Sequence, residues 1–239
     1  MCHNNQYRVI GLIIIILVCV NGLSYEALTE KGQQILENVK QIGISKDTTK
    51  IDYLLSLAND EYMAWDIRIE AINSLYKIDH TSALSQLEIL FNSQKTIPVN
   101  IGDPDDHRNI FIVELAKAIC LLKTQNLSTK KKVEYLANQI REYGIKPGLG
   151  AGAQKVLILH SKDWTIPMLD LFEDKNAMVR ATAINAFRDN PDIRAKDKLM
   201  KALKDSEKWN RMGAAKALEK LGIKTKKLNA NYEYEIVSE

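Results

Sequence analysis

Apolar residues recur at the spacing of amphipathic helices over most of the chain. Large apolar side chains that fall three or four residues apart lie on one face of a helix, so each such run predicts a helix. An opening helix is expected over residues 28–42, and after it each short amphipathic run precedes a second, more apolar run. The first runs of these pairs span residues 51–57, 83–91, 133–140, 166–172 and 199–203. The pattern therefore predicts consecutive helix pairs.

A motif repeats in three of the second runs. Arg stands three residues before an Ala, a large apolar residue stands four residues after that Ala, and an Asp lies upstream of the Arg. The copies are Asp60, Arg68, Ala71 and Leu75; Asp174, Arg180, Ala183 and Phe187; and Asp205, Arg211, Ala214 and Leu218. The Asp is expected to cap the second helix, and the Arg to bond that Asp or a neighbouring backbone carbonyl. Two weaker copies carry Ile112 and Gly150 at the Arg position.

The segment from Leu171 to Phe187 resembles a HEAT repeat, and the segment from Ala202 to Leu218 resembles the short HEAT-like repeats of phycobilisome lyases. The resemblance is strongest over residues 163–222. It implies an all-α protein, a right-handed α-solenoid (superhelix) of about five HEAT-like helix pairs. A single pair buries too little apolar surface to be stable, so neighbouring pairs must stack into a continuous core. The resemblance also implies a scaffold or binding role and names no reaction.

The first 22 residues differ from the rest. Arg8 precedes an apolar run over residues 9–20, which is shorter than the roughly 20 residues of a membrane-spanning helix and is typical of a secretory signal peptide. Cleavage is expected after Gly22, or alternatively after Ser24. Two other interpretations stay open. Cys19 is lipidated, although the sequence departs from a bacterial lipoprotein box at Val18. Alternatively, the segment is not cleaved and stays as a membrane anchor. We therefore expect an exported protein, periplasmic or extracellular, with membrane contact only if the segment is retained or Cys19 is lipidated.

The repeat array is assigned to residues 23–222, with a loop insertion at 95–107, and a flexible tail is expected over 223–239. Residues 232–237 of the tail alternate as a strand would. The loop offers oxygen and nitrogen ligands in Asp103, Asp105, Asp106 and His107, which suit a cation. Turn formation and capping of the next helix account for the same residues, so no metal is assigned.

The composition restricts the functions that the chain can have. Lys and Arg number 33 and Asp and Glu 30, and a formal net charge of +3 gives no support to a nucleic-acid binder. No His is followed by Glu, unlike the His-Glu ligand sets of HEAT-like iron hydroxylases, and no cofactor is expected. Loss of the signal leaves Cys120, which is expected to be a buried hydrophobic residue. The glycines over 148–152 are expected to form a tight turn, and the three tryptophans are expected to pack in the core.

A candidate binding surface follows from the repeat spacing. The position two residues after each aligned Ala is Asn73, Lys117, Lys155, Asn185 or Lys216. In a stacked array these residues form a polar ladder across the second helices, and we hypothesise that it contacts an extended or acidic protein partner. A merely solvated face is the alternative. The function predicted is a non-catalytic protein-binding or scaffold module. The alternatives are a lipid-anchored envelope protein with the same role, an enzyme, and a DNA-glycosylase-like HEAT protein using Trp209 and Arg211.

Overall fold

The computed structural model describes residues 28–78, 81–95 and 107–237. Within these ranges the chain is almost entirely helical, as predicted. The helices are α2 (Glu30–Ser45), η1 (Thr48–Lys50), α3 (Ile51–Asn59), α4 (Trp65–Ile78), α5 (Thr81–Lys95), α6 (His107–Thr124), α7 (Thr129–Tyr143), α8 (Leu149–His160), α9 (Thr165–Asp170), η2 (Leu171–Glu173), α10 (Ala177–Asp189), η3 (Ile193–Ala195), α11 (Lys196–Ala202) and α12 (Lys208–Lys220). Two short strands follow, β1 (Thr225–Lys227) and β2 (Tyr234–Ile236).

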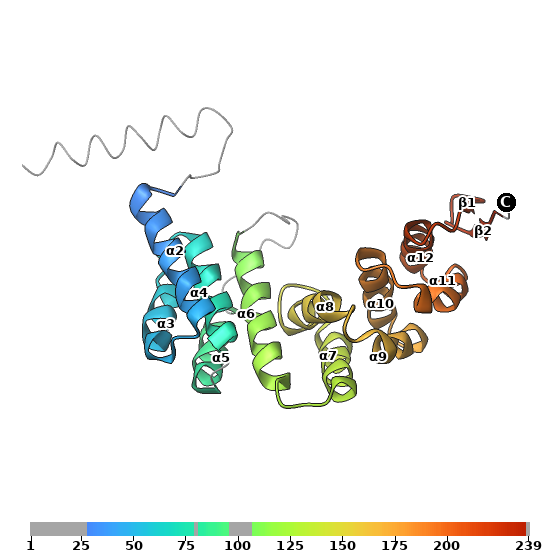
Figure 1. Ribbon diagram of the computed structural model, residues 1–239. Coiled ribbons are helices and arrows are strands. Elements are labelled where there is room, and N and C mark those ends of the chain that lie inside the picture. Colours follow the sequence, from blue (N-terminus) through green and yellow to red (C-terminus); the bar gives the residue numbers. More distant parts are fainter. Residues whose placement is uncertain (1–27, 79–80, 96–106, 238–239) are drawn as a thin grey trace, which may run out of the picture.

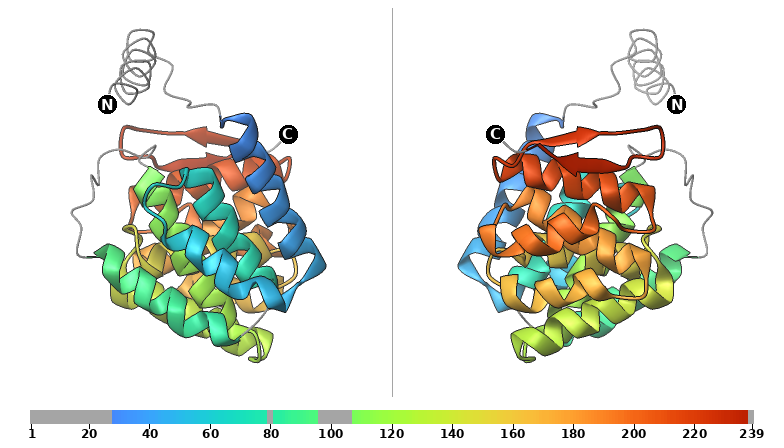
Figure 2. Two further views of the ribbon diagram at one scale, coloured as in Figure 1. Left: turned by 90° about the vertical axis from the view of Figure 1, so that its left-hand side faces the viewer. Right: turned by 90° about the vertical axis from the view of Figure 1, so that its right-hand side faces the viewer.

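The helices form two rows that follow one arc (Figure 1). In the inner row, α2, α4, α6, α8, α10 and α12 each pack against the next helix of the row. In the outer row, α3 packs on α4, α5 on α6, α7 on α8, η2 on α10 and α11 on α12. Figure 2 shows the same array from its two ends, with the helices stacked behind one another. This arrangement is solenoid-like, and it places the inner row on the hollow side of the arc.

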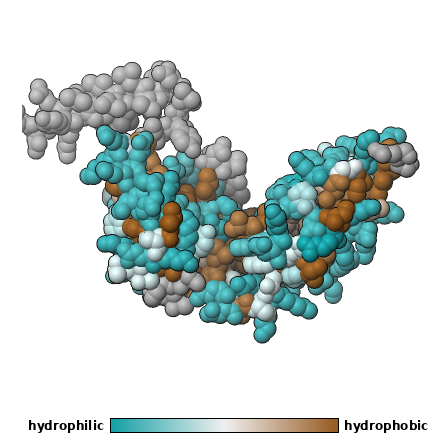
Figure 3. Space-filling model, viewed as in Figure 1, coloured by the Kyte–Doolittle hydropathy of each residue, from teal (hydrophilic) through white to brown (hydrophobic). Residues whose placement is uncertain are grey.

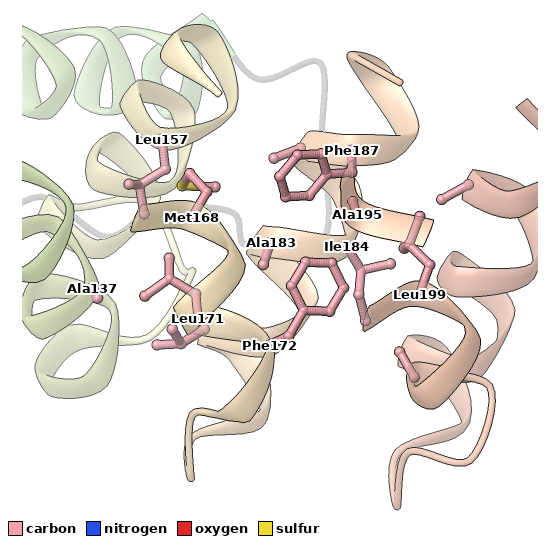
Figure 4. Packing of buried hydrophobic residues seen from close by; sticks show 14 of the residues in the cluster. Ala137, Leu157, Met168, Leu171, Phe172, Ala183, Ile184, Phe187, Ala195 and Leu199 are labelled. Atoms are coloured by element: carbon pink, nitrogen blue, oxygen red, sulfur yellow. The ribbon is translucent and has the colours of Figure 1, made fainter. Parts of the chain in front are cut away.

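The motif residues predicted to be core are buried. Ala71, Ala183 and Ala214 have no exposed surface, and Phe187 lies between α9, α10 and α11 (Figure 4). Its ring packs 5.7 Å from that of Phe172, centroid to centroid. Small Ala side chains let the helices approach, while the large residue one turn later fills the space between them. The buried residues form one cluster toward each end of the array, and α6 contributes side chains to both.

The prediction of a tight turn at residues 148–152 is wrong for most of that segment, because α8 begins at Leu149. The glycines serve close packing instead. A Cβ on Gly152 would lie 2.6 Å from the carbonyl carbon and Cβ of Ala116 and from the backbone nitrogen of Lys117, all on α6. A Cβ on Gly150 would lie 1.7 Å from the carbonyl oxygen of Gly144. These glycines therefore let α8 pack directly against the backbone of α6 and of the preceding turn.

The tail after α12 has a defined backbone. β1 and β2 pair antiparallel, with Lys226 opposite Glu235, and Tyr234 packs against the C-terminal hydrophobic cluster. The strand-like alternation over 232–237 is thus realised in part as β2. Flexibility of the tail stays a prediction.

The predicted signal segment, residues 1–22, lies outside the described residues, as does most of the loop insertion. Across the part of the chain that the structure describes, no helix combines the length and the apolar character that crossing a bilayer requires.

Candidate interaction surface

The five residues of the predicted ladder lie one on each successive inner helix. Asn73 is on α4, Lys117 on α6, Lys155 on α8, Asn185 on α10 and Lys216 on α12. Each inner helix packs on the next, so the spacing argument placed these residues on adjacent helices correctly. Their environments differ, however, and this divides the ladder into two parts.

The first part is a buried polar network centred on Glu114 of α6. The Glu114 carboxylate forms ion pairs with Lys117 on the same helix and with Lys155 on α8. Lys117 Nζ also donates to Asn73 Oδ1 at 2.9 Å and lies 5.3 Å from the centre of the Tyr76 ring. The network therefore joins α4, α6 and α8.

The ladder is not a uniformly exposed face, contrary to the hypothesis drawn from its spacing. Lys117 is only 8% exposed, because the close approach of α6 and α8 encloses it together with Glu114. Burial favours the neutral form of Glu114, but hydrogen bonds from Lys117 and Lys155 outweigh it and lower the pKa of this carboxyl. Lys155 keeps 49% of its side chain exposed. Sequence reasoning missed Glu114, which lies three residues before Lys117.

The second part of the ladder is open. Asn185 is half-buried and Lys216 is exposed. Within the described residues, neither side chain forms a hydrogen bond or an ion pair. The two halves of the inner surface thus offer different chemistry: both lysines of the first half pair with Glu114, whereas Lys216 of the second half forms no ion pair with a described residue. In Figure 3 apolar residues gather at the middle of the hollow and again on the arm at the right, whereas the arm at the left is more hydrophilic.

The repeat Asp residues shape the turns between helices but do not cap the second helices as expected. Asp174 Oδ1 accepts from the backbone nitrogen of Asn176 at 2.8 Å, and Asn176 itself caps α10. Asp205 Oδ1 likewise accepts from Glu207 at 2.8 Å, and Asp60 Oδ1 accepts from Tyr62 at 2.9 Å. Each Asp thus forms a turn three or more residues before the first residue of the next helix, because its short side chain reaches the backbone two residues on.

The repeat Arg residues bond backbone carbonyls, as predicted, and they also join neighbouring repeats. Arg180 donates to the carbonyl of Asp174 at 2.8 Å and reaches the Asp205 carboxylate of the next repeat at 2.7 and 2.9 Å. Arg141, which carries no motif signal, pairs in the same way with Asp174. Arg211 has no following repeat, and its Nε donates to the carbonyl of Tyr232 in the terminal hairpin at 3.1 Å. The hairpin thus takes the place of another repeat.

The first motif copy departs from this scheme. Arg68 Nε donates to the carbonyl of Ala58 at 3.0 Å, and its guanidinium lies 4.4 Å from the ring centres of both Trp65 and Phe111. Such cation–π stacking suits the planar guanidinium. In the first repeat, Arg68 thus packs between aromatic rings on α4 and α6 where the later repeats use an Asp.

Acid should weaken the junction between the last two repeats. Burial raises the pKa of Asp205, but hydrogen bonds from Arg180 and from the Glu207 backbone outweigh it and lower that pKa. A carboxylate with a lower pKa in the folded state adds stability above about pH 4, and that stability is lost as pH falls through the folded pKa. In urea denaturation followed by circular dichroism, Asp205→Asn should be less stable than the parent at pH 7. The difference should shrink toward pH 3, and a constant difference would contradict the assignment.

The weak metal candidates receive no structural support. Asp103, Asp105 and Asp106 lie outside the described residues, and His107 is the exposed first residue of α6. Among the residues that the structure describes, no three His, Cys, Asp or Glu side chains are grouped to hold a metal ion.

The predictions that Cys120 and the three tryptophans lie in the core are confirmed for some of these residues and wrong for Trp209. Cys120 is fully buried, as predicted, and burial raises the pKa of its thiol to about 12. Trp65 packs on Phe111, and Trp164 is buried and stacks on His160. The core prediction is wrong for Trp209, which is 60% exposed at the start of α12. Met178, at the equivalent position of α10, is 43% exposed as well.

Comparison with protein families identifies the C-terminal part of the chain. A family model described as HEAT repeats matches residues 167–230, which include α10, α11, α12 and β1. Residues 167–230 are thus similar to HEAT repeats. This confirms the family predicted from the repeat spacing, while the closer likeness to phycobilisome lyases stays a prediction. A search of curated proteins finds no match.

Proposed function

We propose that this HEAT-repeat protein is a non-catalytic protein-binding or scaffold module that uses its inner surface. HEAT arrays present extended concave surfaces, and their usual role is to bind other proteins. The observation that carries the proposal is the ladder itself, which has one polar residue on each of five successive inner helices and keeps Lys155 and Lys216 exposed. We further propose that the array is a right-handed superhelix of five helix pairs, opened by α2.

The chemistry of the buried ionisable groups favours binding over catalysis. Glu114 is held as a carboxylate by two lysines, so it is poorly suited to act as a general acid. The buried thiol of Cys120, with its pKa raised to about 12, is poorly suited to act as a nucleophile. Both groups stabilise the array instead.

We also propose that the protein is exported. The support is the sequence pattern of residues 1–22. Mass spectrometry of the protein from its own cells tests this proposal: a first residue at Leu23 is expected. A diacylglyceryl group on Cys19 would favour envelope anchoring, and an intact Met1 would contradict cleavage.

The binding function is tested by cross-linking the tagged full chain in its own cells and identifying the attached proteins. The variant Lys155→Ala/Asn185→Ala/Lys216→Ala removes the ladder but keeps Lys117, whose loss would disturb packing. We expect this variant to lose the partner that the parent captures. The matched control, Lys130→Ala/Lys131→Ala, changes exposed lysines of the outer helix α7 and should keep the partner. Equal capture by parent and ladder variant would contradict the proposed surface.

A further inference from the structure

The last helix pair and the strand that follows it are strongly basic, although the charge of the whole chain is nearly balanced. Residues 194–227 contain twelve Lys or Arg and four Asp or Glu, a net charge of +8, whereas the full chain has +3. Part of this charge is compensated inside the fold, since Lys198 and Lys201 pair with Glu173, and Lys226 pairs with Glu235. Lys204, Lys216 and Lys220 are exposed and form no ion pair with any described residue. This end of the molecule therefore has cations available for a partner.

Two of these cations share the inner face of α12 with an aromatic side chain. Trp209, Lys216 and Lys220 follow at intervals of seven and four residues, so they lie along one side of the helix. That side is opposite the buried Ala214 and Leu218 and faces the hollow of the arc. Lys208 adds a third cation, because its Nζ lies 4.4 Å from the centre of the Trp209 ring.

The neighbouring helix extends the apolar part of this face. Met178 stands on α10 at the position equivalent to Trp209, 31 residues earlier, and is 43% exposed. The side chain of Asn210 donates to the backbone carbonyl of Ala177 at 3.2 Å, which holds the first turns of α10 and α12 together. Trp209 and Met178 thus occupy equivalent positions at the starts of two adjoining helices, and Lys216 and Lys220 share the side of α12 on which Trp209 lies.

We infer that the inner face of α12, together with Met178, anchors an acidic protein segment that carries large apolar side chains. The inference rests on the proposed protein-binding function and locates its main contact. Trp is one of the residues in which interface hot spots are enriched. The uncompensated charge of this face selects acidic residues. The opposite half of the ladder fits such a segment less well, since both of its lysines already pair with Glu114 and Lys117 is buried.

Titration of the full chain with synthetic peptides tests this inference. The probe is a fluorescein-labelled peptide of alternating Glu-Glu and Leu-Leu pairs, followed by fluorescence anisotropy. The parent should bind it, with affinity that falls as salt is raised. A peptide with Lys in place of Glu, and one with Ser in place of Leu, should bind at least about tenfold more weakly, because one loses the charge match and the other the apolar contact.

The protein variants locate the contact. Trp209→Ala should weaken binding at least about tenfold, as expected for loss of an anchoring Trp. Lys208→Ser/Lys216→Ser should weaken it and reduce its dependence on salt. The control Lys130→Ser/Lys131→Ser, on the outer helix α7, should leave binding unchanged. Circular dichroism checks that each variant folds; should Trp209→Ala unfold, Trp209→Phe replaces it and is expected to weaken binding by a smaller factor.

Three results would overturn the inference: no binding of the acidic–apolar peptide, equal binding by parent and Trp209 variant, or binding of phosphatidylglycerol vesicles in preference to the peptide. These are distinguishable from failure of the proposed function. If cross-linking in cells captures a partner that the ladder variant loses, while the peptide binds the parent and the Trp209 variant equally, the protein-binding function is supported and its main contact lies elsewhere. If the peptide binding depends on Trp209 but no protein is captured in cells, the inner face of α12 binds acidic and apolar groups as inferred, and the proposed protein-binding function is contradicted.

Discussion

Gly152→Ala is expected to lower the free energy of unfolding by about 1–3 kcal/mol, which is the usual cost of overpacking a well-packed interior. Helix propensity alone predicts the opposite sign, since Ala is favoured over Gly in a helix by about 1 kcal/mol. At Gly152 the cost of the steric clash should exceed the gain in helix propensity. The new Cβ would lie 2.6 Å from three atoms of α6, two of them backbone atoms, so α6 and α8 would have to separate.

Gly32→Ala is the matched control, because Gly32 also lies within a helix, α2. A Cβ there would meet the Cδ2 atom of Leu28 at 3.3 Å, and that flexible side chain can move away. This variant should therefore be neutral or more stable by about 0.4–1 kcal/mol. Urea denaturation followed by circular dichroism measures both variants. Similar stability changes in the two would show that α6 and α8 are not in the close contact described.

The repeat spacing predicted the framework of this molecule well. The Arg, Ala and large apolar positions recur because every helix pair must present the same buried face to its neighbours. That requirement also fixes which positions face the hollow, so the spacing alone places the ladder residues on successive inner helices. Buried Ala183 and Phe187 follow directly from the same frame.

The contacts between repeats were less predictable. Glu114 pairs with Lys117 and Lys155, but it falls in a different column of the repeat, so an alignment of ladder positions does not include it. Arg141 lies on an outer helix and reaches Asp174 without any motif to mark it. The burial of Lys117 depends on how closely two helices approach, and that distance depends on glycines whose role the sequence left ambiguous.

The exposure of Trp209 follows from the side of the helix on which it lies. Tryptophan is often buried, which favoured a core position. However, Trp209 stands seven residues before Lys216 and therefore shares its side of α12. Met178, at the equivalent position of α10, is 43% exposed as well, so the exposure belongs to this column of the repeat. The repeat spacing thus contained the signal, and the general preference of tryptophan for the core obscured it.

Glu114→Gln should be the most destabilising of the charge changes, at about 3–5 kcal/mol, the cost of leaving a buried charge without its partner. Gln keeps the size of the side chain but removes the charge that compensates Lys117, which is 8% exposed. Lys155 contributes little to the loss, because its half-exposed ammonium can be solvated by water. Urea denaturation of parent and variant at pH 7 measures the effect.

Glu70→Gln is the matched control, since Glu70 occupies on α4 the repeat position that Glu114 occupies on α6. Its pair with Lys77 spans 3.1 Å, and both side chains are more exposed than those of Glu114 and Lys117. Removing this pair should cost no more than about 1 kcal/mol. Equal losses for Glu70→Gln and Glu114→Gln would show that burial does not strengthen the Glu114 network.

A double variant separates the value of the ion pair from the cost of breaking it. Glu114→Leu/Lys117→Met replaces the buried pair by apolar side chains of similar size, and such replacements are often neutral or stabilising. We expect the double variant to recover most of the stability that Glu114→Gln loses. Recovery would mean that the network is retained for how it positions Asn73, Lys117 and Lys155 on the inner surface. A double variant as unstable as the single one would instead make the network a main source of the stability of the array.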